Sequence, residues 1–311
     1  MTIRIVALLG AGCIAAMLSS GCRREPTAAP SAAPVDKVFL ADDAIWRTQR
    51  RADLLRADGW TSLIGLHWIE LKAHYIGSSA DSGIRLAKGP PKMGLLQQQD
   101  GRLFFTPEKG IALTLDGQPL RGRVELKTDH DDAPSVIGFD DGKGVMTVIR
   151  RGDRRALRVK HADAEARAQF AGLDYWPPDP SWRIDARFVP HPPGKTIGIA
   201  NIIGMMEQIP NPGVVEFQRD GRPYRLEALD EGGDSLFLIL ADRTSGHGSY
   251  GAGRYIDAPK PDAGGKLVVD FNRAYNPPCA FTAFATCPLP PPENRLDLAI
   301  TAGEKAYKGG H

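Results

Sequence analysis

The densest group of polar and reactive side chains lies between residues 250 and 304. Arginines and carboxylates occur there beside asparagines, tyrosines and two cysteines, in a segment stiffened by prolines. One interpretation is a network of ion pairs and hydrogen bonds that fixes an irregular loop, because buried charges require partners. The other is a preorganised pocket in which an arginine binds an anion and a cysteine or glutamate reacts.

The pocket interpretation assigns roles to particular residues. Arg254 and Arg273 would contact the anion. Cys279 would act as the nucleophile and Glu293 as the acid or base. The candidate binding residues around them are Tyr250, Asp270, Asn272, Tyr275, Asn276, Asn294 and Arg295. No serine-hydrolase elbow, zinc-protease motif or phosphate-binding glycine loop accompanies them, so both interpretations stay open.

Residues 1–21 have the features of a bacterial lipoprotein signal peptide. A short positive segment precedes the apolar run 5–18, which is shorter than the about 20 residues of a membrane-spanning helix. Small residues directly precede Cys22, as the lipobox requires, although Ser19 stands where leucine is usual. We expect cleavage before Cys22 and lipidation of its sulfur. The alternative is an ordinary secretory signal that leaves Cys22 free or paired.

Residues 22–40 combine the lipidated cysteine with a linker rich in proline, alanine and serine, which is predicted to be disordered. The lipid on Cys22 would anchor the chain to a membrane of the cell envelope, with the rest facing the periplasm. Arg23 stands in place of the aspartate that retains some lipoproteins in the inner membrane, so the outer membrane is mildly preferred.

The chain encodes four cysteines. Cys13 belongs to the signal and Cys22 is expected to carry lipid, so Cys279 and Cys287 remain. In an oxidising compartment such a pair favours a disulfide, which would contribute about 2–3 kcal/mol of stability. A reduced pair that acts in redox or metal chemistry, or two unlinked thiols, are the alternatives.

The composition is that of a globular protein, with 311 residues, 42% hydrophobic, 24% charged and a formal net charge of +2. The basic residues form no long runs, so nucleic acid is not expected as a partner. His67, Glu70 and His74 could share one face of a helix as a metal site, but their largely apolar surroundings favour a strand or turn. We expect neither a metal nor a cofactor.

One amphipathic helix is expected at the start of the folded part. Asp42 or Asp43 can cap it and Gly59 can stop it. Its apolar side would be formed by Ile45, Trp46, Leu54 and Leu55.

Short β-favouring runs dominate the remainder and predict a mainly β fold of antiparallel sheets, a sandwich or a barrel-like arrangement. Asp-Gly pairs at 116–117, 141–142 and 220–221 are strong hairpin signals. The expected strands are 83–86, 103–106, 111–115, 124–127, 145–150, 157–160, 214–218, 224–228, 235–241, 266–270 and 296–300.

A composition shift at 175–180 indicates a boundary between two β subdomains. The first, 41–180, would contain the helix and a sandwich-like part, and the second, 181–311, would carry the polar segment. A single large β domain is the alternative.

The polar segment resembles a known family. The runs Asp-Phe-Asn-Arg-Ala-Tyr-Asn-Pro-Pro-Cys (270–279) and Cys-Pro-Leu-Pro-Pro-Pro-Glu-Asn-Arg-Leu (287–296), with Ala-Gly-Glu-Lys (302–305), closely resemble the bacterial domain-of-unknown-function 1684 family. Glycine-containing pairs between 59 and 78 extend the likeness, which spans 41–307. The resemblance implies a β-rich domain, often on an envelope lipoprotein, and implies no activity.

The stretch 77–126 also resembles a forkhead-associated β sandwich. The residues with which those domains read phosphothreonine are missing, because Ser78 rather than arginine follows Gly77 and no Ser-x-x-His occurs in the stretch. Only the scaffold could be shared, and a scaffold does not supply function.

Three functional hypotheses follow from the sequence. The first is a membrane-tethered binding or assembly module whose partner is an envelope protein or a small molecule. The second is an enzyme, such as a hydrolase, that acts on a small molecule or envelope component through the 250–304 segment. The third is thiol redox or metal handling at Cys279 and Cys287.

Overall fold

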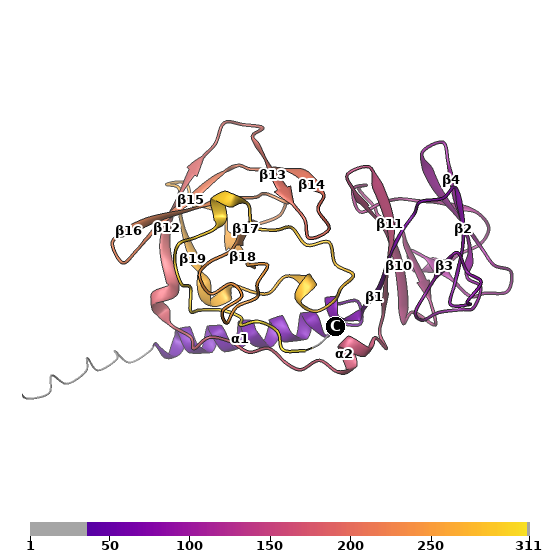
Figure 1. Cartoon of the computed structure of the whole chain (residues 1–311), viewed down its shortest axis with the longest axis horizontal. Coiled ribbons are helices and arrows are strands. Elements are labelled where there is room, and N and C mark those ends of the chain that lie inside the picture. Colours follow the sequence, from indigo (N-terminus) through magenta and orange to yellow (C-terminus); the bar gives the residue numbers. More distant parts are fainter. Residues whose placement is uncertain (1–35, 310–311) are drawn as a thin grey trace, which may run out of the picture. The chain divides into compact units, whose positions relative to one another are not determined.

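The computed structural model describes residues 36–309. The predicted signal peptide and the lipidation site Cys22 lie outside the described residues. The described chain is mainly β, as predicted, and its strands form two groups, β1 to β11 and β12 to β19, which are drawn in indigo to magenta and in red to yellow (Figure 1).

The helices are α1 (Lys37–Leu54) and α2 (Glu165–Ala168), with short 3-10 turns η1 (Trp60–Ser62), η2 (Pro180–Trp182), η3 (Phe271–Arg273), η4 (Pro278–Ala280) and η5 (Pro292–Asn294). The strands of the first group are β1 (Leu63–Trp68), β2 (Ala73–Gly77), β3 (Ile84–Arg85), β4 (Gly94–Gln99), β5 (Arg102–Pro107), β6 (Thr114–Leu115), β7 (Gln118–Pro119), β8 (Val124–Leu126), β9 (Val136–Phe139), β10 (Gly144–Arg151) and β11 (Arg154–His161). Those of the second group are β12 (Arg183–Pro190), β13 (Thr196–Ala200), β14 (Met206–Pro210), β15 (Gly213–Arg219), β16 (Arg222–Ala228), β17 (Ser235–Leu240), β18 (Arg254–Pro259) and β19 (Lys266–Asp270).

The first group forms a six-stranded sheet in the order β1-β11-β10-β9-β6-β7 and a five-stranded sheet in the order β3-β2-β4-β5-β8. Neighbouring strands are antiparallel except for β2 and β3. Apolar side chains of both sheets share one buried core, to which Leu96 and Phe105 contribute from one side and Met146 and Leu157 from the other. The two sheets therefore pack as a sandwich.

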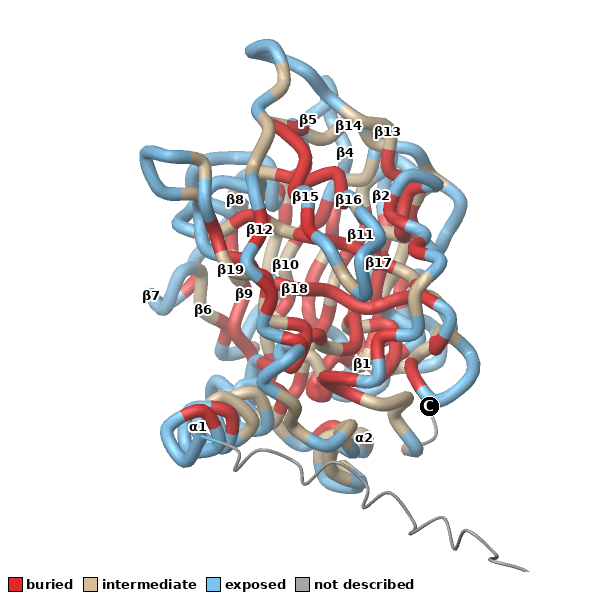
Figure 2. The backbone as a smooth tube through the Cα atoms, turned by 90° about the vertical axis from the view of Figure 1, so that its left-hand side faces the viewer, coloured by how far each residue is buried: buried red, intermediate tan, exposed pale blue. Residues whose placement is uncertain are grey.

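The second group contains a four-stranded antiparallel sheet, β16-β15-β12-β19, and the strand pairs β13-β14 and β17-β18. Its main core joins Val215 and Leu226 of the sheet to Leu238 and Ile256 of the β17-β18 pair. Buried residues run along the middles of the strands, whereas the hairpin tips and the outer side of α1 are exposed (Figure 2).

Aspartate-glycine turns set the register of several hairpins. At 116–117, 141–142 and 220–221 both residues have φ between 51° and 83°, as the left-handed turns of tight hairpins require. The three turn predictions are confirmed. The same geometry at 100–101 joins β4 to β5, a hairpin that the prediction omitted.

Helix α1 begins earlier than predicted. Its N-cap is Asp36, whose side chain accepts a hydrogen bond from the Val38 N–H at 2.9 Å, so the predicted cap at Asp42 or Asp43 is wrong. The helix ends at Leu54, ahead of the expected stop. The reason is that nothing between residues 37 and 41 interrupts a helix, and Asp36 supplies an earlier cap.

The face of α1 that packs on the protein also differs from the prediction. Phe39, Asp43 and Leu54 are buried, whereas the expected core residue Ile45 is 69% exposed. Asp43 is paired with Arg47 at 2.7 Å. The helix therefore docks partly through charged side chains, which a search for apolar periodicity does not detect.

Other differences concern single segments. The run 296–300 is not a strand, because its backbone bonds to irregular partners such as the Ala241 carbonyl and the Asp242 carboxylate. His67 and His74 lie on β1 and β2 rather than on a helix, and the described residues contain no group that could hold a metal ion. None of the helices between residues 36 and 309 is both long and apolar enough to cross a membrane.

Candidate functional site

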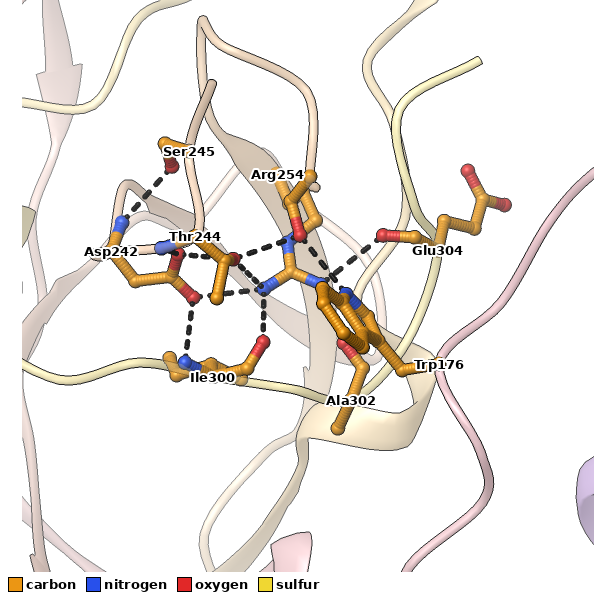
Figure 3. Close-up of polar contacts among 9 residues, drawn as sticks. Trp176, Asp242, Thr244, Ser245, Arg254, Ile300, Ala302 and Glu304 are labelled. Carbon is orange, nitrogen blue, oxygen red and sulfur yellow. Dashed lines mark hydrogen bonds and ion pairs between the residues drawn. The ribbon is translucent and has the colours of Figure 1, made fainter. Parts of the chain in front are cut away.

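Arg254, a predicted anion contact, is buried at the start of β18 and is 1% exposed. Its Nη2 lies 2.8 Å from Oδ2 of the fully buried Asp242 and donates to the Ile300 carbonyl at 3.0 Å (Figure 3). Its Nη1 donates to the carbonyls of Ala302 and Glu304. The charge of Arg254 is therefore neutralised inside the protein, with no face open to a ligand.

The same network fixes the loop that joins β17 to β18. Oδ1 of Asp242 accepts hydrogen bonds from the Thr244 N–H at 2.8 Å and its hydroxyl at 2.6 Å (Figure 3). The Ser249 hydroxyl lies 2.8 Å from that of Thr244 and accepts a hydrogen bond from the Trp176 indole at 3.2 Å. For this part of the 250–304 segment the contacts favour the structural interpretation.

The predicted binding asparagines are buried as well and bond to backbone. Asn272 exchanges two hydrogen bonds with Asp179, and Asn294 exchanges two with Glu227. Asn276 donates from Nδ2 to the Lys305 carbonyl at 2.8 Å. Such side-chain amides stabilise irregular backbone, because they form hydrogen bonds with backbone N–H and C=O groups that have no partner in a sheet.

Three other predicted residues lie on the surface. Arg273 is exposed and lies 3.7 Å from Asp270. Glu293 and Arg295 are exposed, and their side chains make no hydrogen bond or ion pair with any residue between 36 and 309. The structure therefore does not bring Arg254, Arg273, Cys279 and Glu293 together in one pocket.

Cys279 and Cys287 are buried and unlinked, so the predicted disulfide is not formed in this structure. They are close neighbours, because the Cys279 N–H donates to Sγ of Cys287 at 3.0 Å. Hydrogen bonding between the thiols lowers the pKa of Cys279 and raises that of Cys287. The Tyr250 hydroxyl donates to the Cys279 carbonyl at 3.1 Å and closes this side of the loop.

A cavity of about 540 Å³ lies where α1, the β10-β11 hairpin and the second group of strands meet. This volume suits a small-molecule ligand. Of the predicted residues, Tyr275 and Cys287 line it. Its other polar or aromatic walls include Trp46, Arg50, Trp60, Arg151, Arg158, Glu231, Asp257 and Thr286.

The most unusual group in this cavity is Arg158. It lies on β11, where Leu157 and Val159 face the sandwich core, so its side chain projects to the opposite side. Its Nε is buried without a hydrogen-bond partner, and no carboxylate between residues 36 and 309 pairs with it. Burial first, and then the charge of Arg151, lower the pKa of its guanidinium to about 10. It still carries a charge at neutral pH, close to the ring of Trp60 at 5.3 Å.

Two further arginines line the cavity, and each has an internal partner. Arg151 lies 2.7 Å from Asp129 and donates from Nε to the Thr286 hydroxyl at 3.1 Å. Arg50 of α1 lies 2.8 Å from the buried Glu304 and packs over the Tyr275 ring at 4.6 Å. Arg158 is therefore the cavity arginine that forms no ion pair with any residue between 36 and 309, although Asp129 lies near enough to offset part of its charge.

A larger hollow, of about 1010 Å³, covers the outer face of the four-stranded sheet. Its charged residues, such as Asp185, Glu216 and Lys266, are all exposed and carry both signs. Because water already solvates these groups, an ion pair with a ligand would contribute little binding free energy. We therefore regard the Arg158 cavity as the candidate site.

Arg50, Arg151 and Arg158 were not among the site residues predicted from the sequence. The sequence contained one indication of Arg158. This arginine lies between the apolar residues Leu157 and Val159 in the middle of the predicted strand 157–160, away from any turn. Nothing in the sequence showed that α1 and the segment near 286 would lie beside it.

The comparisons with known proteins identify the family. Residues 168–305 match the family described as "Protein of unknown function (DUF1684)". The chain belongs to this family. The prediction from the 270–279 and 287–296 runs is thus confirmed, although the matched residues begin at 168 rather than 41.

Two solved structures resemble parts of this DUF1684 protein. An uncharacterized protein of Haloarcula marismortui, determined by solution NMR, is 33% identical, with 45% of this chain and 78% of that chain covered and a TM-score of 0.37. The N-terminal FHA domain of EssC, a component of the bacterial Type VII secretion apparatus, is 14% identical, with 32% and 46% covered and a TM-score of 0.25. No curated protein matches the chain.

Proposed function

We propose that this DUF1684 protein is a membrane-tethered envelope lipoprotein whose folded part binds a small anionic ligand in the Arg158 cavity. The observation that carries the proposal is the unpaired guanidinium of Arg158 on the wall of a cavity of ligand size. A half-buried charge without a partner is unfavourable, and an anion that forms charge-assisted hydrogen bonds with it offsets that cost.

The tether is supported by the lipobox before Cys22 and by the proline- and alanine-rich stretch that follows it. A lipid on Cys22 and a linker of this kind would hold the cavity near a membrane surface while leaving it open to the periplasm. The ligand would then be a component or metabolite of that compartment.

Thermal unfolding of the mature protein with increasing inorganic phosphate tests the cavity. Phosphate at about 100 times its Kd would stabilise the folded state by about 2.7 kcal/mol. Arg158→Met removes the charge at similar length and should abolish this stabilisation. Arg154→Met is the matched control, because Arg154 lies on the same strand but is exposed and paired with Glu70. Equal stabilisation of wild type and Arg158→Met would overturn the proposal.

A second candidate function is thiol redox chemistry. It is favoured by the close approach of Cys279 and Cys287 and by the lowered pKa of Cys279, since the thiolate is the reactive form. Alkylation of the native protein distinguishes the possibilities: rapid labelling of Cys279 supports redox activity, whereas labelling only after reduction and unfolding indicates a structural disulfide.

A further inference from the structure

The cavity that holds Arg158 has a second region of opposite charge. Asp257 on β18 and Glu231 in the loop before β17 both line it. Both are exposed at its rim, while Arg158 is half-buried. The cavity is therefore cationic on the side of β10 and β11 and anionic on the side of β17 and β18, while α1 contributes one charge of each sign, from Arg50 and Asp53.

The two carboxylates form no ion pair with any residue of the described chain. Partial burial, followed by the nearby charge of Asp257, raises the pKa of Glu231, and Arg151 offsets this only in part. The Tyr275 hydroxyl donates to Oδ2 of Asp257 at 3.0 Å. A cation placed between Glu231 and Asp257 would relieve their mutual repulsion.

Aromatic rings surround this anionic side. Phe237 and Tyr255 have ring centroids 4.9 Å apart, and Tyr255 and Tyr275 are 5.8 Å apart, both pairs edge to face. All three line the cavity. Carboxylates beside an aromatic ring favour an ammonium group, through ion pairing and cation–π attraction. Arg50 already covers the Tyr275 ring at 4.6 Å and Tyr255 is buried, so Phe237 is the ring that would contact the ammonium group.

We propose that the ligand of this cavity is a small zwitterion, with an anionic group at Arg158 and an ammonium group at Asp257 and Glu231. This inference rests on the proposed function and adds the second charge. Two kinds of molecule have this chemistry, an amino carboxylic acid and an amino phosphate ester, and the experiment separates them.

Isothermal titration of the full mature protein with two matched pairs of probes tests the inference. The pairs are phosphoethanolamine against ethyl phosphate, and β-alanine against propionate. In each pair only the first member carries an ammonium group. We expect the zwitterion of at least one pair to bind about twofold to fivefold more tightly than its partner, as an additional ion pair at a solvated rim provides. The pair that binds identifies the anionic group.

The Asp257→Asn, Glu231→Gln double variant should lose this preference while it binds the simple anion at least as well as wild type. Arg158→Met should bind neither member of the pair. The wild-type comparison alone decides the question if a variant fails to fold.

Each other outcome overturns a defined part of the account. Equal binding of both members of a pair would overturn the zwitterion and leave anion binding intact. Binding that Arg158→Met does not weaken would overturn the proposed function as well, as would the absence of binding by all four probes.

Discussion

At the scale of single residues, two arginines occupy the interior in contrasting ways. Arg254 is paired with Asp242, donates hydrogen bonds to three carbonyls and is 1% exposed. Arg158 has no such partner and faces a cavity. The sequence pattern drew attention to Arg254 because it lies in a polar segment, yet its partners make it structural. Whether an arginine has an ion-pair partner depends on the fold, and composition alone does not show it.

We predict that Arg254→Met destabilises the protein strongly. The change leaves the Asp242 carboxylate buried without its cation, and breaking such a pair typically costs about 3–5 kcal/mol. The free energy of unfolding from urea titration measures this loss. Arg273→Met, in the same segment but exposed, should change it by less than about 1 kcal/mol. Equal effects of the two substitutions would show that the Arg254 network is not what holds the loop.

A second prediction concerns pH. Burial opposes ionisation of Glu227, but hydrogen bonds from His191 and Asn211 and the charges of His191 and Lys195 outweigh it, so the pKa of Glu227 lies below its ordinary value of 4.5. A carboxyl with a lowered pKa in the folded state stabilises the protein above its unfolded pKa, and this contribution is lost as the pH falls through the folded value.

The stability of wild type should therefore fall more between pH 6 and pH 3 than that of Glu227→Gln. Urea unfolding at a series of pH values provides the measurement. Parallel curves for the two proteins would contradict the assigned shift.

At the scale of elements, the attachment of α1 depends on ionic contacts. Arg50 reaches Oε1 of Glu304 at 2.8 Å and the Asn276 carbonyl at 2.9 Å, and Glu304 is 0% exposed. The helix thereby ties a segment near residue 50 to one near residue 304 and at the same time presents Arg50 to the cavity.

Glu304→Gln should loosen this attachment. It leaves Arg50 without its counter-ion, at an expected cost of about 3 kcal/mol. Hydrogen exchange of the α1 amides should accelerate while exchange in β10 and β11 stays unchanged. Arg51→Met is a suitable control, because Arg51 is the adjacent helical residue and is exposed. An unchanged exchange rate in α1 would mean that other contacts hold the helix.

The elements also show what could be predicted from sequence. The runs 103–106, 145–150 and 214–218 became β5, β10 and β15, because alternating apolar residues and Asp-Gly turns act locally. Strands such as β13 and β18 were missed, because they contain glycine, alanine, aspartate or proline, which are depleted in strands. The helix was predicted, and Leu54 of its expected apolar side is buried, but Ile45 is exposed and the charged Asp43 is buried instead.

At the scale of the whole molecule, the candidate site could not have been assembled from the sequence. Its walls come from residues near 50, near 155 and between 231 and 288, which only the fold brings together. Tyr275 was predicted because it lies in the polar 250–304 segment, and Cys287 because it is one of the two cysteines left for a disulfide. Arg151 and Arg158 lie outside the matched residues 168–305, so the cationic side of the cavity comes from the part of the chain that the family match does not cover.

The proposed tether gives a prediction for the mature protein. Intact-mass analysis should show cleavage before Cys22 and a lipid mass on that cysteine. The same spectra with and without reductant report on Cys279 and Cys287, since a disulfide lowers the mass by two hydrogens. An unmodified Cys22 would contradict the lipoprotein assignment without affecting the cavity.

The central claim is that Arg158 binds an anion. The most direct measurement is a crystal structure of the folded part soaked in bromide, whose anomalous signal marks bound anions. We predict a bromide peak inside the cavity in contact with Nε or Nη of Arg158, and its loss in Arg158→Met. A cavity without a peak, in a crystal that shows bromide elsewhere, would contradict the account, as would a carboxylate of the protein seated on Arg158.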